Sequence, residues 1–236
     1  MPTASAPRRT LVTGANRGLG LEFVRQLLAR GDHVVATSRH PGRAHALNQL
    51  VGEHPGRLHV LPLDAADPKT HAELAREIPL VVDGLDLLIN NAGVLHSGER
   101  FGQVPPAQLD DSLRTNASGP FLLTQTLAAH LVDGATVANV SSVLGSIAST
   151  SGFHTPSYAI SKAAQNMATV LLAQALAERG IAVLALHPGW VQTDMGGVGA
   201  QVTPAQSVGG LLSVIDAATL ADSGRFLDWQ GQPLPW

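Results

Sequence analysis

The fold of this 236-residue chain is decided by the stretch Thr13-Gly14-Ala15-Asn16-Arg17-Gly18-Leu19-Gly20. An apolar run typical of a strand, residues 10–13, leads into it, and an amphipathic stretch typical of a helix, residues 19–30, follows. Glycines permit a tight turn and a close approach of the backbone to a ligand, and a helix N-terminus offers free N–H groups to a phosphate. The stretch therefore predicts a pyrophosphate-binding loop, although an ordinary glycine-rich βα turn would look the same on its own.

Strand-like and helix-like segments alternate along the rest of the chain. Most apolar runs are continuous, as expected for parallel strands that are covered on both faces. The predicted strands are residues 10–13, 33–37, 58–61, 85–89, 135–140 and 181–186. The predicted helices are residues 19–30, 43–51, 69–78, 107–132, 158–179 and 204–217. This order predicts an α/β fold, a single-domain Rossmann-type doubly wound parallel sheet with helices on both faces.

Composition narrows the classes of function. Hydrophobic residues make up 44% and charged residues 14%, which suits a packed core, and a net charge of −3 without a basic run argues against nucleic-acid and membrane partners. The absence of cysteine excludes thiolate metal sites and favours a cytoplasmic location. No apolar run reaches the roughly 18 residues of a membrane helix, and the histidines lack metal-ligand spacing. We interpret residues 1–8 as a flexible N-terminal tail and residues 9–236 as one domain.

The end of the second predicted strand, Ser38-Arg39, indicates the choice of coenzyme. A site for NAD normally places an acidic residue here for the ribose hydroxyls, and its carboxylate would repel a 2′-phosphate. Ser38 is neutral, Arg39 can pair with a phosphate in a bidentate manner, and Arg17 in the glycine loop adds a second cation. These residues predict NADP(H); the alternative is that Arg39 is an ordinary solvated arginine.

Tyr158 and Lys162 are the candidates for proton transfer. They stand four residues apart in a predicted helix, so both side chains lie on one face, one turn apart. A free phenol has a pKa of about 10, and a nearby ammonium is expected to lower the pKa of Tyr158 toward neutrality. On its own, such a pair is more often an ordinary helix-surface pair. Its position after a Ser-Ser pair, Ser141-Ser142, in a chain with a coenzyme loop favours the catalytic interpretation.

Several motifs occur together in a fixed order. They are the Gly-x-x-x-Gly-x-Gly loop, Asn90-Asn91-Ala92-Gly93, the pair Ser142 and Gly145, Tyr-x-x-x-Lys and the string His187-Pro188-Gly189-Trp190-Val191-Gln192-Thr193-Asp194-Met195-Gly196-Gly197. Over nearly its whole length the chain resembles the short-chain dehydrogenase/reductase superfamily. The last string, with Phe226-Leu227-Asp228-Trp229 and the terminal Leu234-Pro235-Trp236, resembles the C-factor/sniffer-like carbonyl reductase branch.

The resemblance implies a role for each matching residue. The expected catalytic tetrad is Asn116, Ser142, Tyr158 and Lys162, in which the asparagine interrupts its helix, while Ser141 is the better candidate for a turn cap. Asp64 is expected at the adenine, although an aspartate after a strand is as often a helix cap. The expected coenzyme contacts are Gly14, Asn16, Arg17, Gly18, Leu19, Gly20, Ser38, Arg39, Asp64, Ala65, Asn91, Ala92, Gly93, Tyr158, Lys162, Pro188, Gly189, Val191 and Thr193.

The function expected from these features is hydride transfer between NADP(H) and a small-molecule carbonyl or alcohol, with reduction of an aldehyde or ketone as the favoured direction. The alternative is a non-catalytic NADP(H)-binding regulatory or signalling protein. Residues 149–156 are expected to form a loop over the substrate pocket with His154 exposed, and residues 194–203 a small mobile lid. The two long predicted helices either form a homodimer or homotetramer interface or are covered within one chain.

Overall fold

A seven-stranded parallel sheet is the centre of the molecule in the computed structural model, which describes residues 7–236. The strand order is β3-β2-β1-β4-β5-β6-β7, and every neighbouring pair is parallel. The strands are β1 Arg9–Val12, β2 His33–Ser38, β3 Leu58–Pro62, β4 Leu85–Asn90, β5 Leu131–Val140, β6 Ala182–His187 and β7 Phe226–Asp228. The order reverses between β1 and β4, where open α/β sheets bind their ligands.

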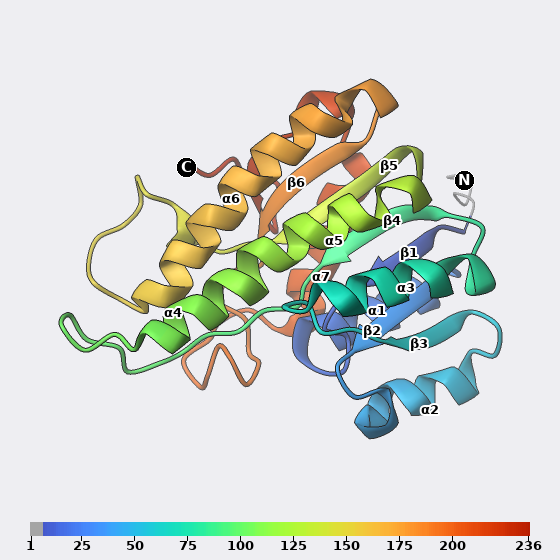
Figure 1. Ribbon diagram of the computed structural model, residues 1–236, viewed down its shortest axis with the longest axis horizontal. Helices are drawn as coiled ribbons and strands as arrows, with labels where there is room; N and C mark the ends of the chain where they lie inside the picture. Colours follow the sequence, from blue (N-terminus) through green and yellow to red (C-terminus); the bar gives the residue numbers. More distant parts are fainter. Residues whose placement is uncertain (1–6) are drawn as a thin grey trace.

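Helices cover both faces of this sheet (Figure 1). One face carries α1 Gly18–Ala29, α2 His45–Glu53 and α7 Pro204–Ala217. The opposite face carries α3 Pro68–Val81, α4 Pro106–Leu113, α5 Gly119–Leu127 and α6 Pro156–Leu176. The predicted doubly wound parallel sheet is thereby confirmed.

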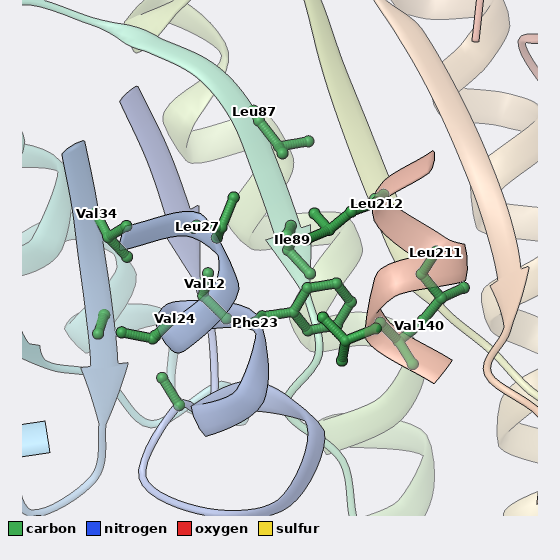
Figure 2. Packing of buried hydrophobic residues seen from close by; sticks show 14 of the residues in the cluster. Val12, Phe23, Val24, Leu27, Val34, Leu87, Ile89, Val140, Leu211 and Leu212 are labelled. Carbon is green, nitrogen blue, oxygen red and sulfur yellow. The ribbon is translucent and has the colours of Figure 1, made fainter. Parts of the chain in front are cut away.

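Two separate hydrophobic cores hold the helices to the sheet. Figure 2 shows the first, in which Phe23 of α1 and Leu211 of α7 meet beside Val140 of β5. Phe23 is completely buried, and its burial contributes about 2–3 kcal/mol. The second core joins α3, α5 and α6 to the other face through leucines such as Leu74, which is 1% exposed. The five inner strands, β2, β1, β4, β5 and β6, contribute residues to both cores, which explains their largely continuous apolar sequences.

The predicted helix 107–132 is wrong as a single element. α4 passes into a π turn, Arg114–Ser118, before α5 begins, and β5 already starts at Leu131. In the π turn the N–H of Gly119 donates to the carbonyl of Arg114. The next residue, Pro120, has no N–H for the carbonyl four residues earlier, that of Asn116. Asn116 therefore lies where the helix is interrupted, as the resemblance implied.

Further differences concern β7, the end of α6 and the N-terminal residues. β7 was not predicted; it is a three-residue strand that pairs with β6 in the register Ala185↔Phe226. The predicted helix 158–179 is α-helical only as far as Leu176; a 3-10 turn, Ala177–Arg179, then leads to Gly180, whose φ is 66°. Of the predicted tail, residues 1–6 lie outside the described residues, whereas the Arg8 N–H donates to Asp32 at 3.0 Å. Over residues 7–236, no helix combines the length and the apolarity needed to cross a membrane.

Candidate active site

The glycine loop lies at the switch point, pressed against the end of β4. A Cβ on Gly14 would approach Cα of Ala92 to 2.8 Å, and its φ of +63° is unfavourable for other residues. A Cβ on Gly20 would lie 2.6 Å from Nδ2 of Asn91. The missing side chains thus let the loop and the first turn of α1 approach the β4 end, and the helix N-terminus remains open to an anion.

The Asn90-Asn91-Ala92-Gly93 segment locks these strand ends together. Nδ2 of Asn91 donates to the carbonyls of Thr13 at 2.8 Å and Gly14 at 3.2 Å. Oγ1 of Thr13 accepts from the N–H groups of Asn91 and Ala92, both at 2.9 Å. The side chain of Asn90 donates to Asn139 on the neighbouring strand at 2.8 Å. These bonds fix the position of the loop independently of any ligand.

The residues predicted to select the coenzyme lie at separate places. Arg39 is exposed directly after β2, and buried Ser38 accepts a hydrogen bond from the N–H of His40 at 3.2 Å. Arg17 instead forms a 3.0 Å ion pair with Asp194, in the loop that follows β6. The exposure of Arg39 is compatible both with the predicted phosphate contact and with an ordinary solvated arginine, so its role stays a prediction. The side chain of Arg17 is directed to a carboxylate that the sequence did not indicate.

Asp64 and Ala65 follow β3, at the same edge of the sheet. Oδ1 of Asp64 accepts from the N–H of Ala66 at 3.0 Å and so closes a local turn. The cap of α3 is a different residue, Asp67, whose side chain accepts from Lys69 N–H. The alternative role of Asp64 as helix cap is thus excluded, and its contact with adenine stays a prediction.

Three members of the predicted tetrad meet where β5 ends and α6 begins. Nζ of Lys162 lies 5.6 Å from the ring centroid of Tyr158, and the side chain of Ser142 is close enough to the Tyr158 hydroxyl to lower its pKa. All three side chains are buried, with 3% to 8% exposure. Gly145 makes this possible, because a Cβ there would lie 2.8 Å from Cβ of Lys162.

Asn116 completes the group from the π turn. Its Nδ2 donates to the Val94 carbonyl at 2.8 Å and to Ser161 Oγ at 2.9 Å, and its Oδ1 accepts from Val94 N–H at 2.8 Å. A Cβ on Gly93 would be 3.2 Å from Oδ1 of Asn116 and 4.0 Å from Nζ of Lys162. The structure therefore brings the four predicted residues and the end of β4 into one site.

The protonation of the site differs from the expectation. Burial raises the pKa of Tyr158 to about 12, and the neighbouring Ser142 side chain acts in the opposite direction. Burial lowers the pKa of Lys162 to about 7. The lysine does not lower the pKa of the phenol as we expected, because a lysine with a pKa of about 7 is neutral at the high pH where the phenol titrates. Its Nζ donates to the Val140 carbonyl at 2.7 Å and to Gln165 at 2.9 Å. Tyr158 consequently holds its proton at neutral pH.

The turn cap that we expected at Ser141 is made by Ser142 instead. Ser142, rather than Ser141, caps the 3-10 turn Val143–Gly145 by accepting from Leu144 N–H at 3.2 Å. Ser141 Oγ is 1% exposed and donates to Oδ1 of Asn166 at 2.6 Å. The turn cap and the contact with Tyr158 therefore belong to the same residue, and the cap fixes the position of its hydroxyl.

The segment after β6 carries the remaining predicted contacts. Gly189 has a φ of +83°, Pro188 accepts from Ser207 Oγ at 2.6 Å, and Val191 pairs with Val202. A Cβ on Gly18 would lie 3.6 Å from the methyl group of Thr193, so this segment reaches the glycine loop. Two hydrogen bonds tie the expected lid, residues 194–203, to the residues before it. Trp190 Nε1 donates to Gly196 O at 2.8 Å, and Gln192 Nε2 donates to Ala200 O at 3.1 Å.

The loops around Tyr158 contain contacts that the sequence did not predict. The carboxylate of Glu99 accepts from both the N–H and the hydroxyl of Ser157, and so caps the first turn of α6. Phe101 and Phe153 meet edge to face, with centroids 5.7 Å apart, between the loop after β4 and the loop before α6. His154 is exposed, as predicted. A carboxylate before a helix is a recognised cap, but a partner so distant in sequence gives no local signal.

The glycine loop at a helix N-terminus and the Ser, Tyr and Lys group at the same strand ends define a Rossmann-type dinucleotide oxidoreductase. The chain belongs to the short chain dehydrogenase family, whose family model matches residues 8–201.

Known proteins that resemble the chain include carbonyl reductases and the C-signal protein. The NADPH-bound carbonyl reductase from chicken fatty liver is 38% identical with a TM-score of 0.91, covering 98% of this chain and 99% of that chain. The carbonyl reductase Sniffer of Drosophila melanogaster is 33% identical with a TM-score of 0.93, covering 98% and 100%. The C-signal protein of Myxococcus xanthus is 42% identical over 154 residues, which are 64% of this chain and 93% of that protein.

Proposed function

We propose that the protein reduces an aldehyde or a ketone to an alcohol with NADPH as the hydride donor. The observation that carries this proposal is the buried group of Ser142, Tyr158 and Lys162, in which Nζ of Lys162 lies 5.6 Å from the centroid of the Tyr158 ring. A phenol with a pKa of about 12 keeps its proton at neutral pH and is therefore poised to act as an acid. Reduction of a carbonyl needs a proton donor at this position, whereas oxidation of an alcohol needs a base.

The surroundings of the glycine loop fit a dinucleotide. A Cβ on Gly14 or Gly20 would collide with neighbouring backbone, and the side chain of the N-cap residue of α1, Arg17, makes no capping hydrogen bond. Arg39 is exposed directly after β2. In Rossmann-type folds the adenosine ribose of the coenzyme binds at this strand end, so the guanidinium of Arg39 suits the 2′-phosphate of NADPH. The chicken relative is described as NADPH-bound, which supports the same choice.

The chain's own residues have distinct tasks in this proposal. NADPH supplies the hydride when bound. Ser142 and Tyr158 donate hydrogen bonds to the substrate oxygen and fix the carbonyl group, and Tyr158 then gives its proton to that oxygen. Lys162 stabilises the phenolate that remains, because it is the nearest cation. Asn116 holds the π turn against the Val94 backbone and so fixes the chain beside the lysine.

The test is consumption of NADPH by the purified protein against a panel of aldehydes, ketones and quinones, with NADH in parallel. We expect turnover with NADPH and little with NADH. Arg39→Leu should reduce the preference for NADPH about tenfold or more, because a charge-assisted contact with the phosphate is lost. Arg43→Leu, an exposed arginine after the same strand, is the matched control.

Two outcomes would contradict this proposal. Equal use of NADH and NADPH by the wild-type protein would overturn the role of Arg39. Tight binding of NADPH without turnover of any carbonyl compound would favour the alternative function, a regulatory or signalling protein that binds NADP(H). The similarity to the C-signal protein is the observation that keeps this second function in consideration.

A further inference from the structure

Gln165 is a buried polar residue that the proposed reaction does not use. It lies on α6, three residues after Lys162, and is 1% exposed. Its Oε1 accepts from Nζ of Lys162 at 2.9 Å. Lysine has only donors, so the oxygen of the amide, and not the nitrogen, must face it.

The other end of the same amide has no partner. Nε2 of Gln165 is buried and makes no hydrogen bond among the described residues. An unpaired buried N–H group is unfavourable, so the side chain is held in this orientation by its oxygen alone. The placement is thus explained by the contact with Lys162 rather than by general packing of the helix.

The ammonium of Lys162 has few neighbours that could hold it in place. The Val140 carbonyl on β5 accepts a second hydrogen bond at 2.7 Å. Two further groups lie near Nζ: the Tyr158 ring on α6, at 5.6 Å, and Gly93 after β4, on which a Cβ would lie 4.0 Å from Nζ. Tyr158 is the one titratable group among them, and burial is the only cause found for the lowered pKa of the lysine.

We propose that Gln165 is a positioning residue for the reaction: its amide oxygen holds the Lys162 ammonium against the Val140 carbonyl and stabilises the protonated lysine inside a buried site. The catalytic consequence rests on the proposed function of Lys162. Without this oxygen, burial is opposed by a single hydrogen bond, and the lysine releases its proton at a lower pH. The amide is suited to this task because it accepts a hydrogen bond without adding a negative charge beside Tyr158.

The composition of the chain makes a direct test possible. It contains two lysines, Lys69 and Lys162, and Lys69 is an exposed residue of α3. Lysine labelled with ¹³C at Cε, in a Lys69→Arg background, gives a single side-chain NMR signal whose titration reports Lys162 alone. The measurement is made on the protein without substrate or coenzyme, so it gives an answer even if no carbonyl compound is reduced.

Gln165→Leu removes the acceptor at similar volume, and we expect the titration midpoint of Lys162 to fall by about one unit or more. Gln165→Glu keeps an oxygen and adds a charge, so the midpoint should rise above that of the wild type. Gln174→Leu, an exposed glutamine on the same helix, is the matched control and should leave the midpoint in place. A wild-type midpoint in either Gln165 variant overturns the proposal.

A second measurement separates positioning from simple stability. With an active protein, kcat of Gln165→Leu should fall about tenfold at pH 7.5, with KM within about twofold, because the neutral lysine no longer stabilises the phenolate. The ratio of variant to wild-type kcat should approach one as the pH is lowered and the lysine regains its proton. A ratio that stays constant with pH would show a structural role only and would overturn the catalytic part of the proposal.

Discussion

The two halves of the site are built in opposite ways. At the glycine loop, the contacts are made by backbone atoms and by the absence of side chains, as at Gly14 and Gly20. Around Tyr158, the contacts are made by buried polar side chains, among them Asn116, Lys162 and Gln165, each 0% to 3% exposed. The first half presents N–H groups to a ligand, and the second holds protons and charges inside the protein.

The two halves of the site are held in shape by different physical constraints. A loop of glycines allows a ligand to approach, and its shape follows from steric exclusion. A buried polar group must satisfy each donor and acceptor, and each partner shifts the pKa of the others. We therefore expect substitutions in the glycine loop to act on coenzyme binding, and substitutions around Tyr158 to act on turnover and on the pH dependence.

The largest expected effect is the loss of the acid. Tyr158→Phe should reduce kcat about a thousandfold, because the proton donor is removed while the ring remains. The affinity for NADPH should change less than about threefold, since the glycine loop is untouched. Steady-state kinetics and a binding titration measure the two quantities. Near-normal turnover of the variant would remove Tyr158 from the reaction.

The second effect concerns His187, at the end of β6. Its Nδ1 accepts from the N–H of Val143, next to Ser142, and burial lowers its pKa to about 4. The unfolded chain binds a proton at His187 below its ordinary pKa of about 6.5, whereas the folded protein does not, so stability is lost as the pH falls from 6.5 to 4. The loss amounts to at most about 3 kcal/mol.

Urea unfolding of the wild type and of His187→Asn between pH 7 and pH 4 measures this effect. The variant should lose stability less steeply, and some slope should remain because burial also lowers the pKa of His71. Replacement of the exposed His154 by asparagine is the matched control and should leave the wild-type slope unchanged. Parallel curves for the wild type and His187→Asn would show that His187 contributes no acid sensitivity.

The fold and the first half of the site could be predicted from the sequence for a physical reason. Continuous apolar runs report strands that are buried on both faces, and a glycine is visible in the sequence wherever a Cβ is excluded. The break in the helix at Asn116 was implied only by resemblance, because α4, the π turn and α5 join without a cap. β7 escaped prediction because three residues show no clear periodicity.

For the second half of the site, the sequence predicted which residues take part but not their hydrogen-bond partners or pKa values. Their spacing placed Tyr158 and Lys162 on one face, but the pKa values depend on burial and on partners from distant segments. Glu99 and Ser157 are 58 positions apart, so no local pattern joins them. The proximity of Gln165 to Lys162 could have been predicted, because residues three apart on a helix are neighbours. The spacing does not show whether the oxygen or the nitrogen of the amide faces the lysine.

A smaller effect is expected in the half that is defined by missing side chains. Gly20→Ala would place a methyl group 2.6 Å from Nδ2 of Asn91, so the loop must shift. NADPH binding should weaken about 100-fold, equivalent to about 2.7 kcal/mol, with the kcat at saturating coenzyme little changed. Gly52→Ala on α2 has open space around it and is the control. A fall in kcat without a change in NADPH affinity would contradict the division of tasks between the halves.

The smallest effect concerns the backbone before α6. Among the described residues, Thr155 is the only non-glycine residue with a positive φ, 41°, and its buried Oγ1 has no hydrogen-bond partner. The glycine loop meets the same backbone requirement with glycine at Gly14 and Gly18. A β-branched residue in this region costs about 1–2 kcal/mol, part of which is offset by the greater flexibility of glycine in the unfolded chain.

Thr155→Gly should therefore stabilise the protein by about 1 kcal/mol, which corresponds to a rise in Tm of about 2–4 °C for a chain of this size. Thr155→Ala removes the unpaired hydroxyl but keeps the unfavourable φ, so it should recover only part of the gain. If Thr155→Gly also keeps the wild-type kcat, the strain is incidental to the reaction. A gain in stability with a loss of kcat would mean that the strained residue helps to position Tyr158, as strained residues at active sites do.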